Sequence, residues 1–142
     1  MEKFFMSMSN SVVSAVLRSP FHRLMSGSLM LLRFHGRTSG RLYEFPVEYM
    51  RHGDTITLFT RRYRRWWMNL QSPAPVTVLL YGQEIAGIAE QLPANHAHMV
   101  AALMARYPWM NPDVIEEIAD KRVMLTIKLN VAAQNAREIA RA

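Results

Sequence analysis

The connections between successive strand-like segments are too short to hold a helix, and this constrains the fold more than any other feature of the chain. His52-Gly53-Asp54 joins an alternating segment to residues 55–60, and Gly82-Gln83 joins residues 76–81 to 84–90. Parallel neighbours need a crossover of about a dozen residues or more, whereas antiparallel neighbours need only a tight turn. The sequence therefore predicts a sheet that is largely antiparallel.

Six segments have the apolar pattern of strands. Residues 28–34, SLMLLRF, are almost continuously apolar, as in a barrel strand or a strand buried on both faces. Residues 43–50 alternate, and Pro46 requires that this strand lie at a sheet edge or contain a bulge. The remaining strands are expected at 55–60, 76–81, 84–90 and 123–129. Six antiparallel strands are expected to close on themselves as a small barrel.

The remaining periodic segments predict helices. Residues 10–25 have apolar residues at three- and four-residue spacings, interrupted by Pro20. We expect this helix to pack on the core, with a position on a membrane surface as the alternative. A short helix is expected within 61–71. Asn95 is the predicted cap of a helix from 96 to about 107, and Asn111 that of another beginning at Pro112.

The length and composition predict one domain. A chain of 142 residues with 50% hydrophobic residues can bury one core and is too short for two comfortable domains. We assign 1–27 to the N-terminal amphipathic helix, 28–130 to a barrel with inserted helices and 131–142 to a C-terminal helix. The whole chain, 1–142, is thus expected to be a single domain of the α+β class.

The charge is unevenly distributed. The formal net charge is +6, and residues 33–65 alone contain eight arginines against three acids. The planar guanidinium group matches phosphate and carboxylate oxygens, so this clustering predicts an anionic partner. The alternative is a solvated basic face.

Several kinds of chemistry are excluded by what the sequence lacks. It contains no cysteine, and its five histidines show no metal-ligand spacing. No nucleophile elbow, phosphate-binding Walker loop or carboxylate pair is present. We expect no metal, a chemistry supplied by a bound cofactor, and a cytoplasmic location. Peripheral membrane contact through the N-terminal helix and a homodimer stay open.

The loop GRTSG at 36–40 is a candidate anion site. Gly36 and Gly40 permit positive φ, and Thr38 and Ser39 add hydroxyls to a run of free amide N–H groups. Flanked by Arg37 and Arg41, such a turn forms an anion-binding nest. A plain connecting loop with solvated arginines is the alternative.

The segment TRRYRRWWMNL at 60–70 combines arginines with aromatic residues. Adjacent tryptophans cannot point the same way on a helix, so we expect one to enter the core and the other to face a groove or the opposite side. Arginines interleaved with aromatics also suit single-stranded nucleic acid, through base stacking and phosphate neutralisation. We retain that function only as a less favoured rival and expect no nucleic-acid partner.

The segments GRTSGRLYEFPVEYMRHGDTITLFT and WWMNLQSPAPVTVLLYGQEIAG resemble the deazaflavin-dependent nitroreductase family, within the flavin and deazaflavin oxidoreductases. The resemblance spans roughly residues 16–90. It implies a split β-barrel of the FMN-binding-protein kind with flanking helices. The implied cofactor is a deazaflavin coenzyme of the F-420 type, with FMN as the alternative.

The resemblance also implies which residues hold the cofactor. Loop 36–40 would meet the phosphate and residue 41 its anionic tail; residues 46 and 47 would flank the ring, and residues 66, 67 and 69 would shape the wall beyond it. The implied contacts are Gly36, Arg37, Thr38, Ser39, Gly40, Arg41, Pro46, Val47, Trp66, Trp67 and Asn69.

The sequence departs from this family at three places. Many members have further cations where this chain has Thr38 and Tyr43, and TRRYRR lacks the glycine-rich insertion of the nitroreductases. A long polyglutamate tail is therefore less securely held, unless Arg61, Arg62, Arg64 or Arg65 substitutes.

The implied reaction is hydride transfer to a small electron-poor acceptor, such as a quinone, enone or nitroaromatic. Tyr43, Tyr49 and Tyr63 are the candidate proton donors, and each has a half-buried structural role as its alternative. A non-catalytic flavin- or tetrapyrrole-binding module of the same fold is the rival function.

Overall fold

The computed structural model describes residues 29–131. The predicted N-terminal helix and the predicted C-terminal helix beyond Val131 lie outside the described residues. In residues 29–131 no helix is both long enough and apolar enough to cross a membrane.

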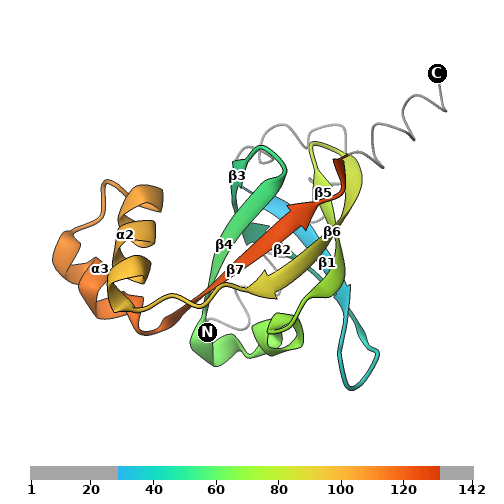
Figure 1. The fold of residues 1–142 in the computed structure, drawn as a ribbon, viewed down its shortest axis with the longest axis horizontal. Helices are drawn as coiled ribbons and strands as arrows, with labels where there is room; N and C mark the ends of the chain where they lie inside the picture. The colour runs from blue at the N-terminus through green and yellow to red at the C-terminus, as the bar shows by residue number, and fades with distance from the viewer. Residues whose placement is uncertain (1–28, 132–142) are drawn as a thin grey trace.

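Seven strands form one sheet in the order β2-β1-β5-β6-β7-β4-β3 (Figure 1). Every neighbouring pair is antiparallel, which confirms the prediction drawn from the short connections. The strands are β1 (Leu29–His35), β2 (Leu42–Glu48), β3 (Met50–His52), β4 (Thr55–Arg61), β5 (Ala74–Leu80), β6 (Gln83–Gln91) and β7 (Arg122–Leu129).

The additional strand arises because the alternating segment predicted at 43–50 is divided at Tyr49. β2 and β3 lie at opposite ends of the sheet order although only Tyr49 separates them in the chain. β2 pairs with β1 on one side of the bend, and β3 pairs with β4 on the other. One bent segment therefore carries the chain from one sheet edge to the other, and this curls the sheet into a split barrel.

Two α-helices and two short 3-10 helices complete the described fold. α2 (His96–Arg106) and α3 (Pro112–Ala119) lie between β6 and β7 in sequence and project to one side of the barrel (Figure 1). Asn95 Oδ1 accepts from the His98 amide and Asn111 Oδ1 from the Asp113 amide, which confirms both predicted caps. The 3-10 helices η2 (Arg62–Arg64) and η3 (Trp66–Leu70) occupy the predicted short helical segment.

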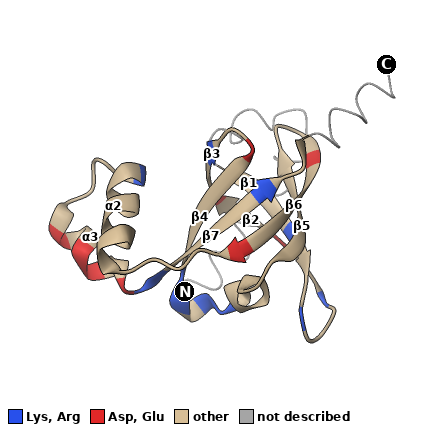
Figure 2. Cartoon of the chain, in the orientation of Figure 1, with Lys and Arg blue, Asp and Glu red and all other residues tan. Residues whose placement is uncertain are grey.

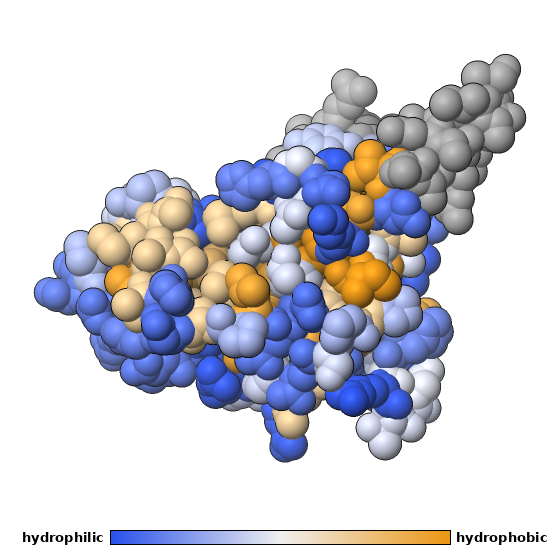
Figure 3. All heavy atoms as spheres, in the orientation of Figure 1, coloured by the Kyte–Doolittle hydropathy of each residue, from blue (hydrophilic) through white to orange (hydrophobic). Residues whose placement is uncertain are grey.

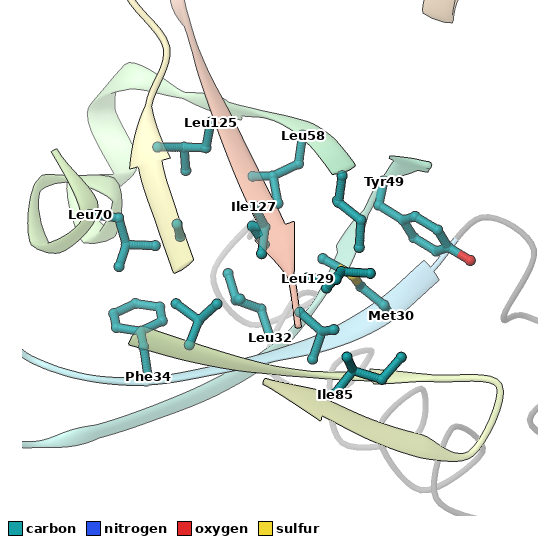
Figure 4. Packing of buried hydrophobic residues seen from close by; sticks show 14 of the residues in the cluster. Met30, Leu32, Phe34, Tyr49, Leu58, Leu70, Ile85, Leu125, Ile127 and Leu129 are labelled. Atoms are coloured by element: carbon teal, nitrogen blue, oxygen red, sulfur yellow. The ribbon is translucent and has the colours of Figure 1, made fainter. Parts of the chain in front are cut away.

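The apolar side chains form two clusters. The larger one fills the barrel, and Figure 4 shows Leu32, Phe34, Leu125 and Ile127 from β1 and β7 within it. The smaller one lies between the helices and β7 and consists of Met99, Leu103, Ile115, Ala119 and Met124. Since successive strand residues point to opposite faces, β7 contributes to both clusters.

Candidate functional site

A groove of about 720 Å³ lies between the barrel and the α2–α3 pair. β2 and β4 supply one side, η2 and η3 one end, and the helices the opposite side. Its lining residues are Tyr43, Phe45, Pro46, Val47, Glu48, Phe59, Thr60, Arg61, Arg64, Trp66, Tyr107, Met110, Ile118 and Arg122.

The groove runs along the edge of β2. A groove over one face of a strand is lined by every second residue of that strand. Here the four consecutive residues 45–48 all line the groove. Within residues 29–131, β2 ends the sheet order and pairs with β1 alone, so its other edge is left for the groove. The expected edge position of Pro46 is confirmed. Backbone groups on such an edge can bind the polar rim of a flat ligand.

Aromatic rings build one wall of the groove. The ring of Trp66 meets that of Phe45 edge-on at 4.9 Å between centroids, and Tyr43 stacks on Phe34 at 5.2 Å. Trp67 instead is buried, and its Nε1 donates to the Arg62 carbonyl at 2.9 Å. The two tryptophans diverge as predicted, and Trp66 is the one that faces the groove.

Three arginines, Arg61, Arg64 and Arg122, lie along the groove. Arg61 and Arg122 are directly opposite each other in the β4–β7 ladder. Burial lowers the pKa of Arg122 from its ordinary value, and the neighbouring Arg61 charge lowers it further. No carboxylate in the described part of the chain forms an ion pair with Arg122. Like charges held this close favour an anion between them.

Tyr107 and Glu48 join the two sides of the groove. The Tyr107 hydroxyl donates to Glu48 Oε2 at 2.9 Å, and Arg106 Nη2 lies 3.7 Å from the same oxygen. Burial raises the pKa of Tyr107, and the hydrogen bond to Glu48 adds to the rise. These contacts link the end of α2 to the end of β2, and so they hold the helical pair against the barrel.

The GRTSG loop is not the free nest that the sequence predicted. Of the six amides from Gly36 to Arg41, four donate to protein atoms. Gly36 donates to the Arg41 carbonyl, Gly40 to the Gly36 carbonyl, Arg37 to Asn69 Oδ1 and Arg41 to Ser39 Oγ. Only the amides of Thr38 and Ser39 donate to no other residue in 29–131. The side chains of residues 37–41 are exposed, and none of them lines the groove.

Asn69 fixes this loop to η3. Its Oδ1 accepts from the Arg37 amide at 2.9 Å, while its Nδ2 donates to the Trp66 carbonyl at 3.0 Å. Asn69 was predicted to shape the wall around a cofactor, and the structure places it behind Trp66 rather than in the groove lining. It connects the loop to the residue that forms the wall.

The structure separates the three candidate proton donors. Tyr43 lines the groove. Tyr49 is 7% exposed in the barrel core, and burial raises its pKa to about 12. Tyr63 is 62% exposed, accepts a hydrogen bond from Arg61 Nη1 and does not line the groove. Tyr43 is thus the one predicted donor that the fold brings to the groove.

Sequence reasoning missed Glu48, Tyr107 and Arg122 as groove residues. Tyr107 lies at the predicted end of its helix, and an aromatic residue with a hydroxyl group at that position was the available signal. Arg122 had no signal of its own, because only strand pairing brings it opposite Arg61.

A second hollow, of about 570 Å³, lies on the β1, β5, β6 and β7 part of the sheet. Arg33 in this hollow forms ion pairs through Nε with Glu44 Oε2 at 2.7 Å and through Nη2 with Glu84 Oε1 at 3.1 Å. The cations that line this hollow are Arg33 and Lys128, whereas the groove is lined by three arginines. Among residues 29–131, no set of three or more His, Cys, Asp or Glu residues is suited to hold a metal ion.

The sequence matches no protein-family model and no curated protein. Solved structures do match. A putative pyridoxamine 5'-phosphate oxidase from Listeria innocua has a TM-score of 0.54 at 12% identity, over 84% of this chain and 94% of that one. An F420-H2 dependent reductase has a TM-score of 0.52 at 16% identity, over 71% of this chain and 93% of that one.

The chain has the split-barrel fold. A further split barrel, the heme storage protein HutZ from Vibrio cholerae, has a TM-score of 0.53 at 9% identity, over 80% of this chain and 90% of that one. At these sequence identities the comparison shows that the proteins share a fold, but it does not assign an activity to this chain. The function has to be argued from the groove.

Proposed function

We propose that this split barrel is an oxidoreductase that binds a deazaflavin or a flavin in the groove between β2 and the helical pair. The observation that carries the proposal is the coincidence of three features in one groove. These are an open strand edge, an aromatic wall and a cluster of three arginines. A flat heterocyclic ring with a phosphate-bearing tail needs all three of them.

The residues present fit such a cofactor. A volume of about 720 Å³ is in the range of pockets that hold small molecules. Pro46 and Val47 on the edge of β2 would flank the ring, and Trp66 would cover one side of it. Arg61, Arg64 and Arg122 would hold the anionic part. The GRTSG loop would contact the anionic part mainly through the side chains of Arg37 and Arg41, because most of its amides already donate to protein atoms.

A reduced ring of this class supplies a hydride to an electron-poor acceptor such as a quinone, enone or nitroaromatic. The chain's own residues prepare the surroundings. Phe45, Phe59, Met110 and Ile118 give the groove an apolar part, which would shield a bound acceptor from water. Tyr43, which lines the groove, would donate a proton to the acceptor oxygen.

A non-catalytic binding module is the second candidate, because one split barrel of similar structure is a heme storage protein. Its distinguishing property is ligand binding without turnover. Anaerobic mixing of the protein with reduced cofactor and a quinone separates the two functions. Oxidation of the cofactor faster than in the protein-free mixture supports the enzyme.

The decisive experiment is a titration of the purified protein with FMN and with a deazaflavin, followed by fluorescence or calorimetry. Arg122→Gln is expected to weaken binding by about 1.5–3 kcal/mol, or roughly 10- to 150-fold, the cost of losing a charged hydrogen bond. Lys128→Gln is the matched control, since it removes a charge from the same strand outside the groove. Equal affinities of the two variants, or no binding of either cofactor, would contradict the proposal.

Arg37→Ala tests the loop in the same titration. If its side chain holds the phosphate, we expect a loss of about 1.5–3 kcal/mol. If Arg37→Ala binds like the wild type while Arg122→Gln does not, the anionic part lies in the groove and the loop prediction is wrong.

A further inference from the structure

One end of the barrel is rich in arginine. It comprises residues 36–43, which connect and begin the β1–β2 hairpin, and residues 61–72, which contain η2 and η3. We call it the arginine end. These two segments contain no Asp or Glu. Their arginines are Arg37, Arg41, Arg61, Arg62, Arg64 and Arg65.

The two segments form one surface although they are far apart in sequence. The hydrogen bond from the Arg37 amide to Asn69 Oδ1, 2.9 Å long, fixes the hairpin loop to η3. In Figure 2 the Lys and Arg segments of the hairpin and of η2 lie toward the lower end of the molecule, with the turn of η3 between them. Figure 3 shows hydrophilic residues over the same end.

Apolar side chains protrude among these charges. Leu42 is 53% exposed at the start of β2, Met68 is 40% exposed in η3, and Tyr63 is 62% exposed in η2. They come from three separate elements. Arg41 precedes Leu42, Arg62 and Arg64 flank Tyr63, and Arg65 precedes the helix η3 that contains Met68. Exposed apolar groups combined with clustered cations are the composition of surfaces that bind membranes.

We propose that the arginine end binds the surface of an anionic lipid bilayer. Anionic headgroups form a layer of negative charge that attracts arginines, and an apolar layer lies directly beneath them. A surface that combines cations with protruding Leu42, Met68 and Tyr63 matches both layers at once. The acids of α3, namely Asp113, Glu116 and Glu117, lie in the helical pair (Figure 2), so the charge distribution orients the arginine end toward the bilayer.

A single-stranded nucleic acid fits this end less well. Such ligands are held by aromatic side chains on which successive bases stack. Trp67 is buried in the core and Trp66 faces the groove. Tyr63 remains as the exposed aromatic ring of the arginine end, and the guanidinium of Arg64 lies 5.8 Å from its centroid. The cations are present without a row of stacking rings.

The surface extends beyond the groove, which it meets at Tyr43, Arg61, Arg64 and Trp66. Leu42, Arg62, Arg65 and Met68 do not line the groove. Variants of these four residues therefore test the inference without changing the lining of the groove. It also differs from membrane contact through the N-terminal segment, because it rests on residues 36–43 and 61–72.

The test is cosedimentation of the full chain with vesicles of phosphatidylcholine alone and of phosphatidylcholine mixed with phosphatidylserine. We expect binding to the mixed vesicles only, weakened by added salt. Leu42→Ser with Met68→Ser, and separately Arg62→Gln with Arg65→Gln, are each expected to lower the partition coefficient by about tenfold. Ile88→Ser with Lys128→Gln is the matched control, because it removes an exposed apolar side chain and a cation elsewhere on the barrel.

Each alternative outcome overturns the proposal. Absence of binding to the mixed vesicles removes its basis. Vesicle binding that is unchanged in both pairs of variants assigns the contact to another part of the chain. A loss in the arginine pair alone overturns the assignment to a bilayer, because the protruding Leu42 and Met68 would then take no part in the contact. An arginine-dependent affinity for oligothymidylate without vesicle binding assigns the surface to nucleic acid. Circular dichroism of every variant checks that it is folded.

Discussion

At the scale of single residues, Gly36 decides how the GRTSG loop can close. A Cβ atom at this position would lie 2.7 Å from Ser39 Oγ and 3.1 Å from Tyr43 Cε2. The Ser39 hydroxyl is also the acceptor for the Arg41 amide. The loop is therefore packed tightly onto a groove residue, Tyr43, and glycine is needed for space rather than for an unusual backbone angle. Gly40 and Gly53, in contrast, have φ values of +67° and +63°.

We predict that Gly36→Ala lowers the free energy of unfolding by about 1–3 kcal/mol, the usual cost of forcing an extra methyl group into a packed site. Part of this cost comes from Ser39 Oγ, which has to move and give up its bond to Arg41. Gly36→Ala should therefore cost less in a Ser39→Ala background. Urea denaturation of the two single variants and the double variant measures the difference. Strict additivity of the two substitutions would show that the hydroxyl is not the obstacle.

At the scale of elements, His96 joins α2 to α3 at the end of the pair where α2 begins and α3 ends. Its Nε2 lies 2.6 Å from Glu116 Oε2 and its Nδ1 lies 2.8 Å from Asp120 Oδ1. The hydrogen bond to Glu116 and then that to Asp120 raise the pKa of His96 above its ordinary value. With both ring nitrogens protonated, the imidazolium ring donates to one carboxylate on each side. The His96 side chain thus links the first residue of α2 to Glu116 within α3 and to Asp120, which caps the C-terminal end of α3.

This contact predicts a pH-dependent stability. Because the folded-state pKa is raised, the stabilisation is complete below the ordinary pKa of 6.5 and is lost as the pH rises through the folded-state value. The difference in melting temperature between the wild type and His96→Gln should be largest at about pH 6 and should shrink toward about pH 9. His98→Gln is the control, because the His98 side chain forms no ion pair within residues 29–131. A difference that stays constant with pH would exclude the ionic contact.

At the scale of the whole molecule, the chain builds two apolar clusters, and the strand β7 contributes buried residues to both. β7 places Val123, Leu125 and Ile127 in the barrel and Met124 against the helices. The Tyr107–Glu48 hydrogen bond is a second link between the two parts. The groove lies between these parts, so its width depends on how firmly the smaller one is held against the larger.

Two leucine truncations are expected to separate the stabilities of the two clusters. Leu103 and Leu125 are each 0% exposed, one in the helical cluster and one in the barrel. Leu125→Ala should lower global stability by about 2–5 kcal/mol. Leu103→Ala should chiefly speed amide exchange in α2 and α3 while the barrel strands keep most of their protection. Hydrogen-exchange mass spectrometry measures both, and equal loss of protection everywhere in both variants would mean a single cooperative unit.

Local patterns in the sequence were sufficient for much of the fold. Tight turns predicted the antiparallel pairing, asparagine followed by proline predicted the start of α3, and the adjacent tryptophans predicted one buried and one groove-facing ring. Each of these depends on residues close together in the chain. Strand phase, helix caps and turn geometry are set by such short-range sterics and hydrogen bonds.

The sequence by itself thus determined the strands, the caps and a cationic, aromatic segment beside a sheet edge. Only the tertiary structure decided that Tyr49 bends one strand into two, that most of the loop amides are already bonded, and that Arg122 faces Arg61. It likewise brought Tyr107 to Glu48, 59 residues away in the chain. The physical reason is that strand register and helix docking are fixed by the packing of whole faces, which no short stretch of sequence contains.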